Sequence, residues 1–261
     1  MVKHSGIRFM SEGPFRAEQF SPRDPYELSH GHALRCLPTG GRWGERTLAG
    51  GAALATDPAV KSAGVDVGFS PEPGMLRAPD VAVGNVPNEP GWVRGVPPLA
   101  VEYADIGQDE PSLQDKIVDL LSAGTKLIWV VRLMGARRVE VYEKGAAVRV
   151  VGDGEELLAP GILQNPVPVA VLFDPEAAYR VTLRNLLQRE GYESVDAIRD
   201  EGRDEGRVEG FAQAILSVLE ARGVSVDERV RAAILGCAEV PRLTQWLARA
   251  TTAVRADDVI R

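Results

Sequence analysis

The middle of the chain alternates short apolar runs with turn-forming residues. Apolar or alternating runs that are bounded by glycine and proline are typical of buried and half-buried strands. Strands are therefore expected at residues 65–69, 79–83, 99–104, 127–131 and 138–142. The first two runs are separated by a turn rich in proline and glycine, which predicts a hairpin.

Residues 111–123 carry the clearest helical pattern in the chain. Pro111 stands in the expected first turn, two acids precede it, and Gly124 follows the last turn. Proline near the start of a helix and glycine just beyond its end are typical boundary signals. The order strand, hairpin, strand, helix, strand predicts an α/β fold in which helices flank a sheet.

The N-terminal region carries weaker patterns. Residues 1–20 show no sustained periodicity and are expected to form a tail. The glycine pairs within residues 32–56 predict loops around short pieces of strand or helix. The folded domain is therefore expected to begin at about residue 21.

Beyond Asp174 the pattern is helical. Residues 175–189 and 211–250 show helical periodicity, and residues 199–210 repeat glycine and charged residues with a period of four. In a helix this period places like charges at i,i+4, and three glycines weaken the helix further. The repeat is therefore either a solvated linker or a surface for self-association. The expected organisation is a tail (1–20), an α/β domain (21–175), a helical linker (176–210) and a small helical module (211–261).

Composition limits the classes of protein that remain. The chain has 261 residues, of which 44% are hydrophobic and 26% charged, as in ordinary globular proteins. Its longest apolar stretch, 127–131, is too short to span a membrane, and the N-terminus lacks a signal-peptide pattern, so a cytoplasmic location is expected. Cys36 and Cys237 have no CxxC partner and are expected to be buried thiols. The net charge of −7 opposes nonspecific binding to phosphates, although a bound cation would reverse the local field.

Two acids lie at or within predicted strands, where apolar residues are expected. Asp80 opens one predicted strand, and Glu102 lies within the next one. Because side chains alternate between the two faces of a strand, Glu102 shares its face with Ala100 and Ala104. These small residues leave room for a cation and its waters. Mg²⁺ favours one or two carboxylates completed by water and substrate phosphate, so the pair suggests phosphodiester chemistry.

Lys116 adds a positive charge to this pair. It lies at the edge of the apolar stripe of the 111–123 helix, from which its side chain can run along the sheet toward the acids. An ammonium group there can polarise an attacking water or stabilise negative charge on phosphorus.

These residues resemble a known family. Pro79-Asp80, the segment from Val101 to Ala104, Lys116 and the segments 123–131 and 139–142 resemble the Uma-two family of restriction-endonuclease-like proteins, within the PD-(D/E)xK nuclease superfamily. The resemblance covers about residues 24–175. It implies a restriction-endonuclease-like mixed sheet flanked by helices and hydrolysis of a phosphodiester by metal-activated water.

The same resemblance implies roles for single residues. It implies that Asp80, Glu102 and the backbone carbonyl of Tyr103 hold Mg²⁺ or Mn²⁺. Ala104 stands where the E-x-K pattern places lysine, so that role passes to Lys116. Glu27, in a Tyr-Glu-Leu segment similar to that of the family, is an auxiliary catalytic candidate. The helix that the family places before its first core strand is expected to be shortened or disrupted by the glycines of residues 40–51.

Two functions remain open at this point. The first is a metal-dependent endonuclease that acts on nucleic acid, with DNA as the expected substrate. The alternative is a catalytically inactive nuclease-fold module that binds or assembles, with a homodimer formed through its C-terminal helices. A fold by itself does not decide between them.

Overall fold

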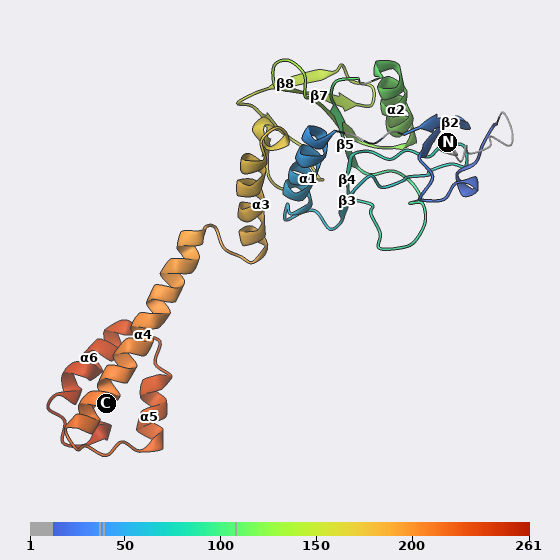
Figure 1. Cartoon of the computed structure of the whole chain (residues 1–261). Coiled ribbons are helices and arrows are strands. Elements are labelled where there is room, and N and C mark those ends of the chain that lie inside the picture. The colour runs from blue at the N-terminus through green and yellow to red at the C-terminus, as the bar shows by residue number, and fades with distance from the viewer. Residues whose placement is uncertain (1–12, 37, 39, 108) are drawn as a thin grey trace, which may run out of the picture. The chain divides into compact units, whose positions relative to one another are not determined.

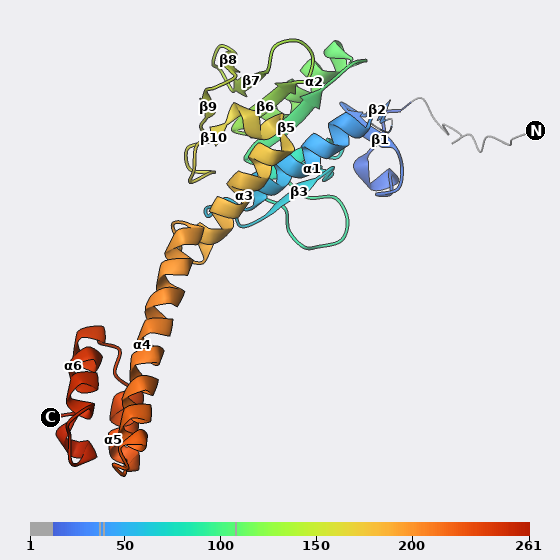
Figure 2. The ribbon, with the colours of Figure 1, turned by 60° about the vertical axis from the view of Figure 1, so that its left-hand side comes forward.

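The computed structural model describes residues 13–36, 38, 40–107 and 109–261 (Figure 1). The chain divides into two compact units, of which the first ends at Glu190 and the second spans Gly191–Arg261. The expected boundary at residue 175 therefore lies one helix too early. The helix that follows it, α3 (Pro175–Arg189), belongs to the first unit, where it lies beside α1 (Gly41–Ala55) (Figure 2).

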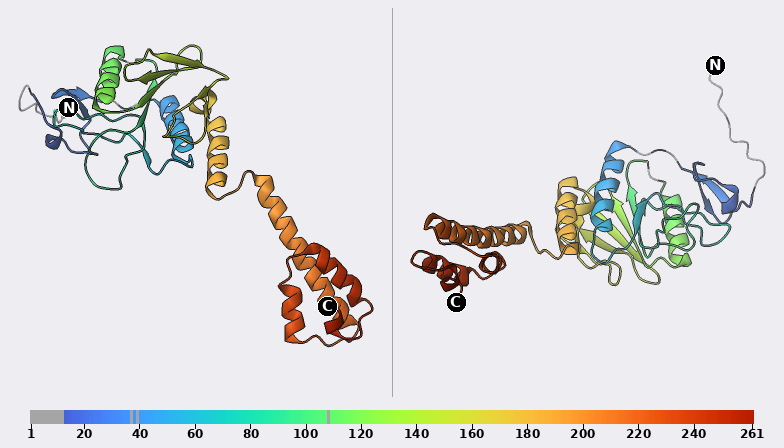
Figure 3. Two further views of the ribbon diagram at one scale, coloured as in Figure 1. Left: turned by 180° about the vertical axis from the view of Figure 1, so that it is seen from behind. Right: turned by 90° about the horizontal axis from the view of Figure 1, so that it is seen from below.

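A six-stranded mixed sheet forms the centre of the first unit. Its strands are β3 (Ala63–Val65), β4 (Val81–Val83), β5 (Leu99–Ala104), β6 (Leu127–Arg132), β7 (Arg138–Glu143) and β8 (Arg149–Gly152), in this spatial order. Neighbouring strands are antiparallel except β5 and β6, which are parallel and are connected through α2 (Glu110–Ala123). Helices cover both faces (Figure 3), so the predicted α/β fold with a mixed sheet flanked by helices is confirmed.

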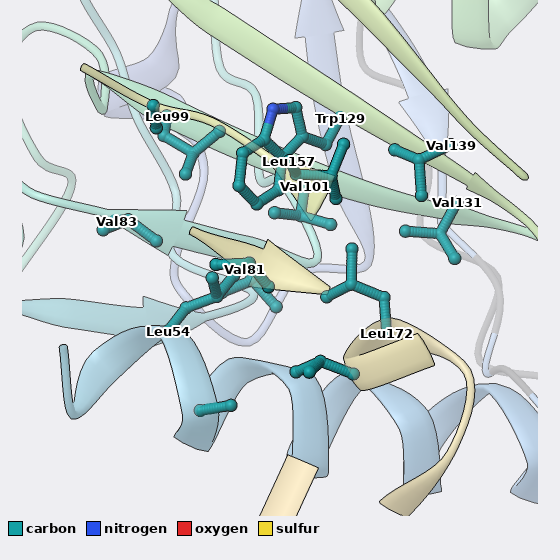
Figure 4. Packing of buried hydrophobic residues seen from close by; sticks show 14 of the residues in the cluster. Leu54, Val81, Val83, Leu99, Val101, Trp129, Val131, Val139, Leu157 and Leu172 are labelled. Atoms are coloured by element: carbon teal, nitrogen blue, oxygen red, sulfur yellow. The ribbon is translucent and has the colours of Figure 1, made fainter. Parts of the chain in front are cut away.

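One face of the sheet is apolar and packs against α1, α3 and a short 3-10 helix (Val169–Leu172). Register aligns Val81, Val101 and Trp129 in one row across β4, β5 and β6. Figure 4 shows this row facing Leu54 of α1 and Leu172. Successive residues along a strand point to opposite faces of the sheet. The residues that precede and follow Val81, Val101 and Trp129 along their strands therefore face α2.

Helix α2 covers the other face, and its sequence signals agree with its structure. Asp109 is its N-cap and accepts a hydrogen bond from the Ser112 backbone N–H, and Gly124 ends it in the left-handed conformation. Its apolar stripe packs on residues of β5 and β6 with small or branched side chains. The members of this second cluster include Ala100, Ala104, Leu113, Ile117, Leu120, Ile128 and Val130.

The glycine-rich segment contains a longer helix than its sequence predicts. The short strand β2 (His32–Arg35) agrees with the expectation of loops around short pieces of strand or helix, but α1 has 15 residues, so the expectation of a shortened or disrupted helix before the core strands is wrong. A Cβ atom at Gly50 would clash with the Tyr103 hydroxyl, and one at Gly51 would lie 3.4 Å from a Val81 methyl group. The glycines therefore allow α1 to lie close against the sheet, and that packing compensates for their low helix propensity.

Packed structure also begins before residue 21. Ala17, in the 3-10 helix Ala17–Gln19, is buried, and its backbone N–H donates to the Pro73 carbonyl at 2.7 Å. Residues 1–12 of the expected tail lie outside the described residues. The expectation for the cysteines is also wrong, since Cys36 is exposed and Cys237 is partly exposed.

The remaining strands of the first unit form two small two-stranded sheets. β1 (Tyr26–Ser29) pairs with β2, and β9 (Glu156–Leu157) pairs with β10 (Val167–Pro168), both antiparallel. β1 contains Glu27 and contacts α2. The sheet of β1 and β2 therefore supplies the Glu27 side chain to the α2 face of the central sheet.

The second unit is helical and has its own core. It consists of α4 (Val195–Ala221), α5 (Glu228–Leu235), α6 (Val240–Ala250) and a 3-10 helix (Ala256–Asp258). Buried residues such as Ile215, Ile234 and Leu243 join these helices in one apolar cluster. α4 is continuous across the predicted boundary at residue 210. Within the described residues, no helix is both long enough and apolar enough to cross a membrane.

Candidate active site

Asp80 and Glu102 lie side by side on the α2 face of the sheet. Val81 pairs with Val101 in the antiparallel register of β4 and β5. Asp80 precedes Val81 and Glu102 follows Val101, so these two acids lie opposite each other. Asp80 immediately precedes β4, and its Oδ2 accepts a hydrogen bond of 2.6 Å from the Tyr103 backbone N–H. Both carboxyl groups are buried, Asp80 with 8% and Glu102 with 6% of its surface exposed. The structure thus brings together two acids that are 22 positions apart in the sequence.

Lys116 of α2 contacts Glu102 of this pair and also Glu27. Its Nζ lies 2.9 Å from Glu102 Oε1 and 3.1 Å from Glu27 Oε1. It also donates to the Ala78 carbonyl at 2.7 Å, which fixes the ammonium beside the segment that leads into Asp80. All four predicted side chains therefore meet on one face of the sheet.

Burial and mutual repulsion change the acidity of these groups. Burial, followed by the charge of Glu102, raises the pKa of Asp80 well above its usual value. Burial raises the pKa of Glu102 to about 7, although the Lys116 charge opposes the shift. Burial alone would lower the pKa of Lys116, but the charges of Glu102, Glu27 and Asp80 outweigh it and raise this pKa. Lys116 therefore stays protonated beside carboxyl groups that are held close together.

A second buried ion pair supports Glu27, and sequence reasoning missed it. Arg77 is 1% exposed, and its Nη1 lies 3.1 Å from Glu27 Oε2. Its Nη2 lies 2.7 Å from Asp119 Oδ2, and Ser29 donates to the same oxygen at 2.8 Å. Asp119 follows Lys116 by three residues on α2, a spacing that places both on one helix face. That spacing was a sequence signal for Asp119, whereas nothing near Arg77 in the sequence indicates its distant partners.

The cluster opens into a cavity of about 700 Å³. Glu27, Asp80, Glu102 and Lys116 line it, together with Tyr103 and residues at the start of α2. A cavity of this volume holds a small-molecule ligand or a segment of a polymer. The four side chains are therefore buried and yet reachable from solvent.

The donor set fits a magnesium-like cation with two protein carboxylates. Among the described residues, no three or more histidine, cysteine, aspartate or glutamate side chains are grouped to hold a metal. Glu102 Oε1 is buried and makes an ion pair with Lys116 but no hydrogen bond, so it has capacity for a ligand. Two close carboxylates with raised pKa values are stabilised by a divalent cation, and Mg²⁺ takes its remaining ligands from carbonyls, water and substrate.

The Tyr103 carbonyl, the third predicted metal ligand, already has a partner. The indole N–H of Trp43, in the first turn of α1, donates to it at 2.8 Å. A carbonyl oxygen has two lone pairs, so this bond leaves capacity for one more ligand. Sequence reasoning assigned no role to Trp43, because nothing near it in the sequence indicates its distant partner.

Comparison with solved structures supports a nuclease-like fold. A crystal structure from Anabaena variabilis, described as "a putative nuclease belonging to DUF820", superposes with a TM-score of 0.50 and 16% sequence identity. The match covers 60% of this chain and 95% of that chain. No family model matches the sequence, and no curated protein matches it. The likeness at this identity concerns the fold.

Proposed function

We propose that the chain is a metal-dependent endonuclease of the PD-(D/E)xK type, related to the Uma-two family, that hydrolyses phosphodiester bonds of nucleic acid. The observation that carries the proposal is the convergence of Asp80, Glu102 and Lys116 in one cavity. The similarity in fold to a structure described as a nuclease supports it. DNA is the substrate we expect.

The proposed roles follow from the contacts of each group. Asp80, Glu102 and the Tyr103 carbonyl would hold Mg²⁺ or Mn²⁺, which when bound supplies Lewis-acid stabilisation and a more acidic water. Lys116, held protonated by its neighbours, orients the nucleophile and stabilises the charge that develops on phosphorus. Glu27 positions Lys116 through their ion pair and assists as an auxiliary acid.

The test is nicking of supercoiled plasmid in Mg²⁺ or Mn²⁺. Glu102→Gln keeps the shape of the side chain but removes its charge, and we expect a loss of nicking of about 10²-fold or more. The matched control is Glu140→Gln, because Glu140 lies on the same sheet face but makes its ion pair with Arg132 outside the cavity. Equal nicking by the Glu102 variant and the native chain would contradict the proposal.

The second candidate is a catalytically inactive module that keeps the nuclease fold and assembles through its C-terminal helices. The observation that favours it is the position of the Lys116 ammonium, whose ion pairs with Glu27 and Glu102 neutralise buried carboxylates as a structural ion pair does. Titration calorimetry with Mn²⁺ and light scattering of the full chain separate the candidates. A dimer that binds no Mn²⁺ and cuts neither DNA nor RNA would establish the inactive module.

A further inference from the structure

A second cavity of about 330 Å³ adjoins the candidate active site. Glu27, Asp80 and Lys116 line both cavities, so a molecule in the smaller cavity lies next to the proposed reacting groups. The other walls of the smaller cavity come from the N-terminal segment, from the end of β3 and from the loop before β5. The proposed chemistry uses only the shared wall and leaves the rest of this cavity without a function.

Three aromatic residues line the smaller cavity, namely Tyr26, Trp43 and Trp92. Trp92 is fixed in place, because its indole N–H donates to the Ala17 carbonyl at 3.0 Å and its ring packs where Gly68 has no side chain. Trp43 is fixed by its bond to the Tyr103 carbonyl. Rings that are already ordered lose little entropy on binding, and flat aromatic surfaces stack on nucleobases whatever the base.

Asp66 contributes a hydrogen-bond acceptor to the same cavity. It follows β3 directly, is exposed, and has a φ of +51°, a strained conformation for a residue other than glycine. Three other acids line the cavity, and each has a partner: Asp24 accepts from the Ser21 N–H, Asp80 from the Tyr103 N–H, and Glu27 pairs with Lys116. Within the described part of the chain the Asp66 carboxylate makes no hydrogen bond or ion pair.

We propose that this cavity binds one unpaired nucleobase that carries an exocyclic amino group, so that the nuclease acts at unpaired positions of nucleic acid, among them those that negative supercoiling opens in a plasmid. The aromatic rings stack on the base, and Asp66 accepts a hydrogen bond from its amino group, as carboxylates do from N4 of cytosine. A base inside a duplex is stacked and paired and cannot enter such a cavity without leaving the helix. The proposal rests on the proposed function, because the phosphate attached to the bound base then lies at Asp80 and Lys116.

Fluorescence anisotropy of labelled oligonucleotides tests the proposal on the full chain. The probes are dC12, dT12 and a mixed-sequence duplex of equal length, in Ca²⁺, with gels to confirm that the probes stay intact. Cytosine and thymine have the same ring size, but only cytosine has an amino group. We expect dC12 to bind about tenfold more tightly than dT12 and than the duplex.

Asp66→Asn is the decisive variant. Asparagine has nearly the same shape and tolerates a positive φ. Its amide carbonyl can still accept from the cytosine amino group, and its NH₂ can donate a hydrogen bond to thymine O4. The dC12 to dT12 ratio should therefore fall to about one. The control, Asp153→Asn, removes the same charge from an exposed position outside both cavities and should leave the ratio unchanged while affecting both affinities alike.

Trp92→Leu tests the stacking surface separately. Affinity for dC12 and dT12 should fall together by about tenfold, with a thermal unfolding midpoint recorded for each variant. Equal affinity of the native chain for dC12 and dT12, or for the duplex, would overturn this inference, as would an unchanged ratio in Asp66→Asn. Plasmid nicking that persists alongside such results would leave the proposed function standing. A chain that neither binds nor cuts any nucleic acid would overturn both.

Discussion

Helices α1 and α4 both contain glycines within their span, and Gly50 of α1 has surroundings opposite to those of the glycines of α4. In α1 a Cβ at Gly50 would clash with the Tyr103 hydroxyl and lie 3.2 Å from Leu172. In α4 no heavy atom outside the helix's own backbone lies within 4 Å of a Cβ built at Gly202, Gly206 or Gly210. The same residue type therefore allows close packing in one helix and only lowers stability in the other.

The largest effect is expected at Gly50. Gly50→Ala should lower the free energy of unfolding by about 1–3 kcal/mol, because the new methyl group overpacks the contact between α1 and β5. The measurement is urea denaturation of the full chain, with hydrogen exchange of α1 amides to assign the loss to the first unit.

A double-mutant cycle with Tyr103→Phe identifies the clashing atom. Tyr103→Phe alone loses the hydrogen bond from its hydroxyl to the Arg46 carbonyl, which is worth about 1 kcal/mol. If the hydroxyl is the obstacle, Gly50→Ala costs less in the phenylalanine background than in the native one. An equal cost in both backgrounds would assign the clash to Leu172 instead.

A smaller effect of opposite sign is expected in α4. Gly206→Ala should raise the free energy of unfolding of the second unit by about 1 kcal/mol, because alanine favours a helix and its methyl group meets nothing. Light scattering accompanies the urea titration. A loss of stability together with a fall in mass would show that the glycines of α4 pack against a second copy of the chain, and the contrast between the helices would then disappear.

The smallest effect is expected at Gly51. Its Cβ would lie 3.4 Å from a Val81 methyl group, an ordinary contact distance. Gly51→Ala should change the free energy of unfolding by less than about 0.5 kcal/mol, because the gain in helix propensity is offset by crowding at Val81. A cost as large as that of Gly50→Ala would mean that α1 as a whole, rather than one position, requires glycine.

The packing of α1 by distant residues explains why the sequence predicts some parts of the fold and not others. Helix α2 and strands β5 and β6 carry local signals, namely a cap, a period and an apolar run, and these were predicted correctly. Helix α1 was missed because the contacts that compensate for its glycines come from Tyr103 and Val81, far along the chain. Local propensity does not contain that information.

The same reasoning applies to the candidate site. The meeting of Asp80, Glu102 and Lys116 was predictable because strand and helix periods determine which face each residue shares. Their catalytic role stays a prediction. Arg77 and Asp66 were not predictable, because an arginine that is buried by distant acids and an aspartate that lines a cavity look like ordinary surface residues in the sequence.

The hydrogen bond from Trp43 to the Tyr103 carbonyl gives the protein an intrinsic optical reporter. Indole emission depends on the polarity and hydrogen bonding of its N–H group, and this N–H shares its acceptor with the proposed cation. Trp43 is one of four tryptophans, so the difference spectrum between the native chain and Trp43→Phe isolates its signal. Binding of the proposed cation should then appear as a change in this signal in an unlabelled sample.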